Sequence, residues 1–142
     1  IRDRSSRDHF GGTTNFYETK KKRDSISRGE SPSRIYIPGR IIIRDLDGDG
    51  LNEVIVNQNQ SSTSRIFDRV RSFDKGEIHN LVWEEGTLIT NWKTREINGY
   101  ISDYQIKDVD NDGEEELVVS VVDLGGIFDR KSTSNIIFFK LF

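Results

Sequence analysis

The sequence predicts an all-β fold, and three observations support this prediction. Short runs rich in Ile, Val, Phe and Tyr recur along the chain, separated by Gly, Asp, Asn and Ser. No stretch shows the apolar periodicity of a long amphipathic helix. The chain also repeats: a shift of 63 residues places IRDLDGDG (43–50) over IKDVDNDG (106–113), and EVIV (53–56) over ELVV (116–119).

The elements follow in order along the chain. Residues 1–34 are expected to form an irregular arm, in which only NFYE (15–18) resembles a strand. Further strands are expected at 40–45, 52–58, 69–73, 80–83, 100–108, 115–122 and 135–142. A second repeated tetrapeptide, IFDR, stands at 66–69 and 127–130. Each repeat unit therefore predicts a small antiparallel sheet of three or four strands, with an acidic loop after its first strand.

Composition narrows the function classes. The chain has 142 residues, 33% hydrophobic and 32% charged, which fits one globular domain with a sizeable core. The net charge of −3 provides no strong field for nucleic acid, so no nucleic-acid partner is expected. No apolar run approaches the ~20 residues of a membrane span. Disulfides and thiolate metal sites are excluded because the chain has no Cys. It begins at Ile1 and has no Met, which indicates a processed or excised piece of a longer protein.

Two acidic loops, DLDGDGLNE (45–53) and DVDNDGEEE (108–116), are the main functional signal. Asp-Gly is typical of a hairpin turn, but a turn gives no reason for acids at loop positions 1, 3, 5 and 9. Calcium does, because it binds six to eight oxygens and would draw alternate carboxylates of a curled loop to one point. Gly at position 6 allows the sharp turn. A magnesium site is less favoured because Mg²⁺ demands octahedral geometry, and the all-oxygen ligands disfavour a soft metal.

The sequence therefore predicts two Ca²⁺ sites. The expected ligands are the side chains of Asp45, Asp47, Asp49 and Glu53 with the carbonyl of Leu51, and the side chains of Asp108, Asp110, Asp112 and Glu116 with the carbonyl of Glu114. An EF-hand is excluded because it closes with Glu at position 12 between two helices. Position 12 is Val56 in one loop and Val119 in the other, both within strand-like runs.

With the apolar runs that follow them, DLDGDGLNEVIV and DVDNDGEEELVVSVV resemble the calcium loops of FG-GAP/VCBS repeats, the blades of integrin-type β-propellers. The stretch from GEIHNLVW to EEELVV is also similar to bacterial VCBS-repeat proteins of the secreted or envelope type. The resemblance covers residues 35–142. Two departures are Glu instead of Asp at position 9 and the lack of a clear Phe-Gly…Gly-Ala-Pro signature. The resemblance implies one blade at 35–98 and a second, incomplete blade at 99–142, with 1–34 as an irregular arm or the outer strand of a preceding blade.

The resemblance implies a calcium-binding, non-enzymatic binding or structural module of a secreted or cell-envelope protein, located extracellularly, in the periplasm or at the cell surface. Two blades cannot close a propeller, so the expected partners are further blades from the same longer chain or another subunit. A protein or carbohydrate ligand is a further expectation. Two alternatives remain: part of a propeller enzyme acting on polysaccharide (a lyase or glycosidase), or a sugar-binding lectin. Trp83 and Trp92 would stack on sugar in a lectin, or otherwise pack between blades.

Overall fold

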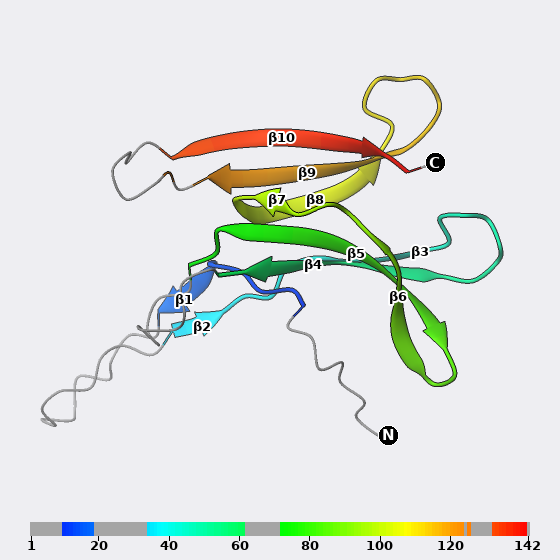
Figure 1. Cartoon of the computed structure of the whole chain (residues 1–142), viewed down its shortest axis with the longest axis horizontal. Helices are drawn as coiled ribbons and strands as arrows, with labels where there is room; N and C mark the ends of the chain where they lie inside the picture. Colours follow the sequence, from blue (N-terminus) through cyan, green and yellow to red (C-terminus); the bar gives the residue numbers. More distant parts are fainter. Residues whose placement is uncertain (1–9, 19–33, 62–71, 124, 126–131, 142) are drawn as a thin grey trace, which may run out of the picture.

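The structure is a computed structural model that describes residues 10–18, 34–61, 72–123, 125 and 132–141. Within these residues the chain forms ten β-strands and no helix, which confirms the all-β prediction (Figure 1). Every strand pair is antiparallel, as predicted. The described part accordingly contains no helix with the length and hydropathy that crossing a membrane requires.

The strands form three sheets. Their bounds are β1 (Phe16–Glu18), β2 (Arg34–Tyr36), β3 (Ile41–Arg44), β4 (Glu53–Gln60), β5 (Lys75–Glu84), β6 (Thr87–Lys93), β7 (Ile97–Asn98), β8 (Tyr100–Lys107), β9 (Glu116–Asp123) and β10 (Thr133–Lys140). The first main sheet has the order β3-β4-β5-β6, and β7 also pairs with β5. The second has the order β10-β9-β8, and β1 pairs with β2 in a separate ribbon.

Most expected strands are present within a few residues of their expected bounds. The expected strand at 69–73 is the exception: residues 69–71 lie outside the described part, and Ser72 and Phe73 belong to no strand. Both copies of the IFDR repeat also lie outside it. The sequence interpretation missed β2, β6 and β7. The sequence signal for β6 was Gly86 in the two-residue turn before it. Glu85 and Gly86 both have positive φ, as type I′ hairpin turns require.

The two main sheets repeat the same design. β4 and β9 have the same bounds after the 63-residue shift, and each is the second strand of its sheet. The acidic loop of each copy joins the first strand to the second, β3 to β4 and β8 to β9. Figure 1 shows both loops at the same end of the molecule, the right-hand end in that view.

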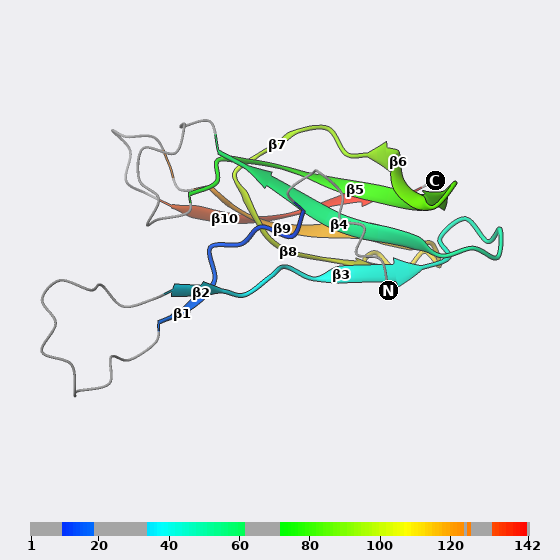
Figure 2. The same cartoon turned by 90° about the horizontal axis from the view of Figure 1, so that it is seen from below.

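The core lies between the two main sheets, where β8 packs against β4 and β5 (Figure 2). Along β9 buried side chains alternate with half-buried ones from Leu117 to Val122, as expected for a pleated strand, whereas in β4 the consecutive residues 55–57 are all buried. The buried cluster consists of Ile55, Ile78, Ile97, Ile101, Tyr104, Leu117, Val119 and Val121. Each fully buried aliphatic side chain of this kind contributes about 1.5–3 kcal/mol of transfer free energy.

A buried amide joins the two sheets at their closest approach. The Asn59 side chain on β4 accepts a hydrogen bond from the backbone N–H of Ile101 on β8 (3.0 Å) and donates to the carbonyl of Ile101 (2.9 Å). It also donates to the carbonyl of Gly12 (2.8 Å). A Cβ at Gly76 would lie 2.6 Å from Ile101 Cδ1, so only glycine allows this approach without displacing a neighbour. The β8–β9 register shifts between Ile101 and Asp103, next to these contacts.

Polar groups close the interface at its edge. The hydroxyl of Tyr104 on β8 donates to the carbonyl of Ile55 (3.1 Å) and contacts the carbonyl of Arg40, and burial raises the pKa of this phenol. The guanidinium of Arg40 forms two hydrogen bonds to the carboxylate of Asp103 (3.0 and 3.1 Å). Arg40 directly precedes β3 and Asp103 lies on β8, so this pair attaches the start of the first sheet to the first strand of the second.

Replacing Asn59 with Ala should destabilise the protein by about 2–4 kcal/mol, because the backbone N–H and carbonyl of Ile101 lose their buried partner. Chemical denaturation followed by tryptophan fluorescence would measure this change. The matched control is Gln60→Ala at the exposed neighbouring position, which should change the free energy of unfolding by less than about 0.5 kcal/mol. Equal effects of the two substitutions would contradict a role for Asn59 in joining the sheets.

Candidate metal centre

The first acidic loop is shaped by hydrogen bonds between its aspartates and its own backbone. Both carboxylate oxygens of Asp45 accept, one from Gly48 N–H (2.8 Å) and one from Gly50 N–H (3.0 Å). Asp47 accepts from Asp49 N–H (3.1 Å), and Asp49 accepts from Leu51 N–H (2.7 Å). The chain curls around the first aspartate, which brings the side chains at positions 1, 3 and 5 to the inside of the loop.

The second loop repeats these bonds at the same positions. The pairs are Asn111 N–H to Asp108 (2.7 Å), Gly113 N–H to Asp108 (3.1 Å), Asp112 N–H to Asp110 (3.2 Å) and Glu114 N–H to Asp112 (2.8 Å). Two sequences that differ at positions 2, 4, 7 and 8 therefore fold into the same hydrogen-bonded turn. The geometry follows from the residues that they share, which are the three aspartates, the glycine and the closing glutamate.

Backbone conformation explains the residue types at positions 4 and 6. Gly50 and Gly113, at position 6, have φ of 90° and 93°. A Cβ at either glycine would meet nothing within 4 Å, so positive φ rather than space favours glycine there. Position 4 is also left-handed, with Gly48 in one loop and Asn111 in the other, and asparagine is one of the side chains that tolerate this conformation.

The folded loops bring most of the expected ligands together. In the first loop, carboxylate oxygens of Asp45, Asp47, Asp49 and Glu53 all lie within 4.8 Å of one another. In the second loop the corresponding group contains Asp108, Asp110 and Glu116 but not Asp112. The side chains of Leu51 and Glu114, for which only a carbonyl role is expected, are exposed. Both groups consist only of oxygen ligands, which hard cations such as calcium prefer.

The closing glutamates are the buried members of these groups. Glu53 is 2% exposed and Glu116 is 1% exposed, each as the first residue of the central strand of its sheet. One oxygen of Glu53 accepts from Leu46 N–H (2.7 Å), and one oxygen of Glu116 accepts from Val109 N–H (3.0 Å). The other oxygen of Glu116 is buried and has no hydrogen-bond partner in the described part of the chain. A buried, unpaired carboxylate oxygen is costly, and a cation bound by the loop would supply the missing partner. The residues present therefore fit a bound divalent cation.

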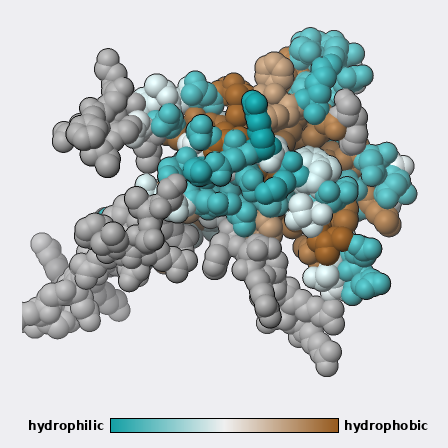
Figure 3. Space-filling model, in the orientation of Figure 1, coloured by the Kyte–Doolittle hydropathy of each residue, from teal (hydrophilic) through white to brown (hydrophobic). Residues whose placement is uncertain are grey.

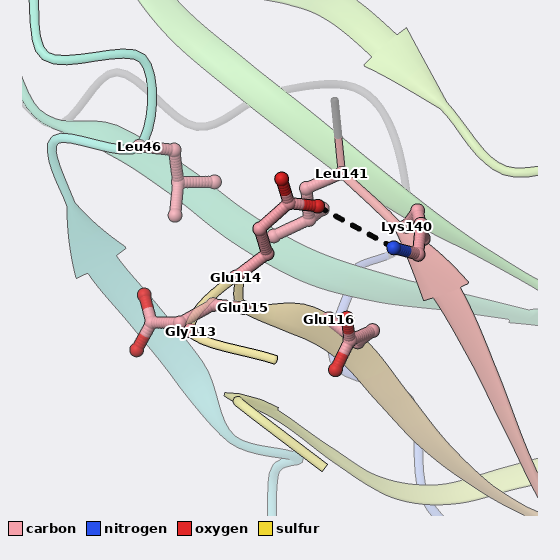
Figure 4. A pocket seen from close by; sticks show the side chains of 7 residues that line it. All are labelled: Leu46, Gly113, Glu114, Glu115, Glu116, Lys140 and Leu141. Carbon is pink, nitrogen blue, oxygen red and sulfur yellow. Dashed lines mark hydrogen bonds and ion pairs between the residues drawn. The ribbon is translucent and has the colours of Figure 1, made fainter. Parts of the chain in front are cut away.

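A lysine that the sequence interpretation did not consider lies beside the second group. Lys140, the last residue of β10, places its ammonium 3.1 Å from Asp112. The same ammonium lies 3.4 Å from Glu114 (Figure 4). The N–H of Glu114 and then Lys140 lower the pKa of Asp112, and Asp112 in turn raises the pKa of Lys140. The pairing between β9 and β10 places Lys140 opposite Glu116. A register drawn between these strands from the sequence alone would have pointed to Lys140.

A cavity of about 510 Å³ lies where the two loops meet. It is lined by Leu46 of the first loop, by Gly113, Glu114, Glu115 and Glu116 of the second, and by Lys140 and Leu141 (Figure 4). An ion pair between Arg44 and Glu115 (2.7 Å) bridges the same two loops, and Glu115 raises the pKa of Arg44. The two loops are therefore neighbours, joined by this ion pair and by a cavity that residues of both loops line, and Glu116 is the one expected carboxylate ligand among the lining residues.

The two tryptophans differ in their surroundings. Trp92 packs against the buried core, whereas Trp83 is 64% exposed and lies opposite Leu88 in the β5–β6 hairpin. Neither lines the cavity between the loops. The packing interpretation therefore fits Trp92, and Trp83 is an exposed aromatic side chain outside that cavity.

In comparisons with known proteins, no family model matches the chain, and neither a curated protein nor a solved structure matches it. The described residues establish an all-β protein with antiparallel sheets and two acidic groups that could hold a metal ion, compatible with calcium.

Replacing Glu116 with Gln should lower stability in calcium but not in chelator. In chelator the variant should be as stable as the wild type or more stable, because an uncompensated buried charge is removed. In millimolar calcium it should be less stable than the wild type by about 1–3 kcal/mol, because the loss of a ligand weakens the binding that stabilises the folded state. Thermal and chemical denaturation under both conditions would measure the two differences.

The neighbouring substitution Glu115→Gln is the matched control, since Glu115 pairs with Arg44 and is no expected ligand. Its effect on stability should be the same in chelator and in calcium. If Glu116→Gln also behaves in this way, Glu116 is not a metal ligand.

Proposed function

We propose that this chain is a calcium-binding segment of an FG-GAP/VCBS-type β-propeller, acting as a non-enzymatic binding or structural module of a secreted or cell-envelope protein. The observation that carries the proposal is the repetition of one turn. Two loops with the same hydrogen bonds each bring together carboxylates at positions 1 and 3 and a buried glutamate at position 9. One such loop is compatible with an ordinary turn. Two such loops at corresponding places in two sheets favour the interpretation that each loop binds the same kind of ligand.

Calcium fits this ligand best. The two groups offer only oxygen, and the loops contribute carboxylates and backbone carbonyls, which are usual calcium ligands. Asp45, Asp47, Asp49, Glu53 and the Leu51 carbonyl would hold one ion. Asp108, Asp110, Asp112, Glu116 and the Glu114 carbonyl would hold the other. The bound ion would neutralise the clustered carboxylates and fix the turn between the first two strands of each sheet.

The strand order supports the assignment of the two main sheets as adjacent blades. In each sheet the strands follow one another in chain order, all neighbours are antiparallel, and the acidic loop joins the first two strands. The sheets stack face to face through an apolar core, the arrangement by which neighbouring blades of a propeller pack. The first sheet has four strands in this path and the described part of the second has three.

Exposed apolar residues on the outer faces support further blades as partners. On the second sheet Ile136 is 73% exposed and Phe138 is 57% exposed, and both lie on β10. On the first sheet Ile41 and Ile43 are exposed, whereas Ile42 between them packs against the core. In Figure 3 apolar surface is visible in the upper part of the view, where Figure 1 places β9 and β10. Blades from the same longer chain or from another subunit would cover such faces.

A non-enzymatic role is favoured because the aspartates of the two loops accept hydrogen bonds from the backbone of their own turns. These bonds engage the aspartate carboxylates in shaping their own turns. Structural calcium sites in extracellular modules bind at roughly 10⁻⁴–10⁻³ M, which suits a location outside the cytoplasm: extracellular, periplasmic or at the cell surface.

Calorimetric titration of chelator-stripped protein should show two calcium equivalents and a higher melting temperature, with a weaker response to Mg²⁺. Asp47→Ala should remove the first equivalent and Asp110→Ala the second, because each side chain belongs to one group only. The matched control is Glu84→Ala, an exposed acid at the end of β5 outside both loops, which should keep two equivalents.

Two results would overturn the proposal. Absence of both heat and a thermal shift with calcium would show that the loops are turns without a metal. Two equivalents retained in both aspartate variants would place the ions somewhere other than the loops.

A further inference from the structure

We propose that Lys140 is a built-in counter-ion of the second loop, which lowers the affinity of that loop for calcium and stabilises its metal-free form. This inference rests on the proposed function, since it concerns how one of the two calcium sites is tuned. A buried carboxylate oxygen without a partner, that of Glu116, points to a cation at this loop independently of the acidic cluster.

The two sheets differ at the position of this lysine. On β10, Lys140 lies opposite Glu116, the closing glutamate of the second loop. In the first sheet, Val54 on β4 lies opposite Leu81 on β5, so continuing this register places Val82 beside Glu53. A half-buried valine therefore occupies in the first sheet the place that a lysine occupies in the second.

The carboxylates at position 5 of the two loops are placed differently. Asp49, at position 5 of the first loop, lies within 4.8 Å of the other acids of its group. Asp112, at position 5 of the second loop, is absent from its group, and one of its oxygens bonds to the ammonium of Lys140 at 3.1 Å. The backbone bond at this position is the same in both loops, from Leu51 N–H in one and Glu114 N–H in the other. The lysine therefore accounts for the different placement of the position-5 carboxylate.

Lys140 differs from Arg44, another cation near this loop. The second loop has two acids without counterparts in the first, Glu114 and Glu115. Arg44 pairs with Glu115, which is not an expected ligand, so that ion pair takes no carboxylate from the metal. Lys140 contacts Glu114 and also Asp112, which is an expected ligand. Calcium and Lys140 thus compete for the same carboxylate.

Two consequences follow for binding at the second loop. Calcium would have to share Asp112 with the ammonium or displace it, and the two positive charges would repel each other. In the metal-free state, Lys140 already offsets part of the repulsion among the acids. Calcium binding therefore relieves less repulsion at this loop. Both effects weaken binding, and both depend on the charge of Lys140 rather than on its length.

The experiment isolates the second loop by removing the first site with Asp47→Ala. In that background, Lys140→Met removes the charge and keeps an unbranched side chain, whereas Lys140→Arg keeps the charge. Calorimetric calcium titration should show about three- to tenfold tighter binding for Lys140→Met. Lys140→Arg should retain the weak binding of the parent. Because salt screens exposed charges, the gain should shrink in about 1 M NaCl, which loss of packing alone would not explain.

Two further measurements complete the test. In chelator, Lys140→Met should lower the melting temperature, because the metal-free acids lose their counter-ion. In an Asp110→Ala background, which leaves only the first site, Lys140→Met should leave calcium affinity unchanged. If Asp47→Ala alone perturbs folding, Asp47→Asn isolates the second loop with a smaller change.

The outcomes separate this inference from the function on which it rests. If the wild type binds no calcium, the proposed function fails and the inference fails with it. If the wild type binds two ions but Lys140→Met leaves the affinity of the second loop unchanged, the inference is wrong and the proposed function stands. If Lys140→Met tightens calcium binding, Lys140→Arg does not, and salt reduces the gain, both the inference and the proposed function are supported.

Discussion

The burial of one glutamate at the start of each central strand is the constraint on which the rest of the structure depends. Glu53 and Glu116 are almost fully removed from water, where an uncompensated carboxylate is expensive. Each accepts one backbone N–H from the second residue of its own loop, which closes the turn. The carboxylates at positions 1 and 3 of each loop then lie within 4.8 Å of this buried group, as does the carboxylate at position 5 of the first loop.

This constraint reaches the sheet interface because the loops are its neighbours. Arg44 precedes the first loop and pairs with Glu115 of the second, and Leu46 of the first loop lines the cavity beside the second. Beyond them, Tyr104 and Asn59 continue the contact between the sheets with hydrogen bonds. An ion that orders either loop would therefore order one end of the interface. Binding of such an ion would then be coupled to the packing of the two sheets.

The sequence predicts the local features well and the distant ones poorly. The bounds of β4 and β9 and the alternation of acids in the loops follow from patterns within about ten residues. The cross-sheet contact of Asn59 with Ile101 spans 42 residues and has no local pattern. Lys140 was missed for the same reason, since it reaches Asp112 only after β10 has paired with β9. β6 was missed because its alternation is weak and most of its residues are exposed.

The remaining question is why the chain places these acids together at all. Backbone N–H groups orient the aspartates but do not neutralise them. Two unit charges about 5 Å apart repel by about 1 kcal/mol even at the dielectric of water, and the first loop holds four carboxylates within 4.8 Å. Protons neutralise carboxylates only in acid solution. Near neutral pH, a bound cation or a basic side chain would offset the repulsion. The first loop has no lysine at the position from which Lys140 contacts the second, so two turns with the same backbone hydrogen bonds differ in how their own side chains offset this repulsion.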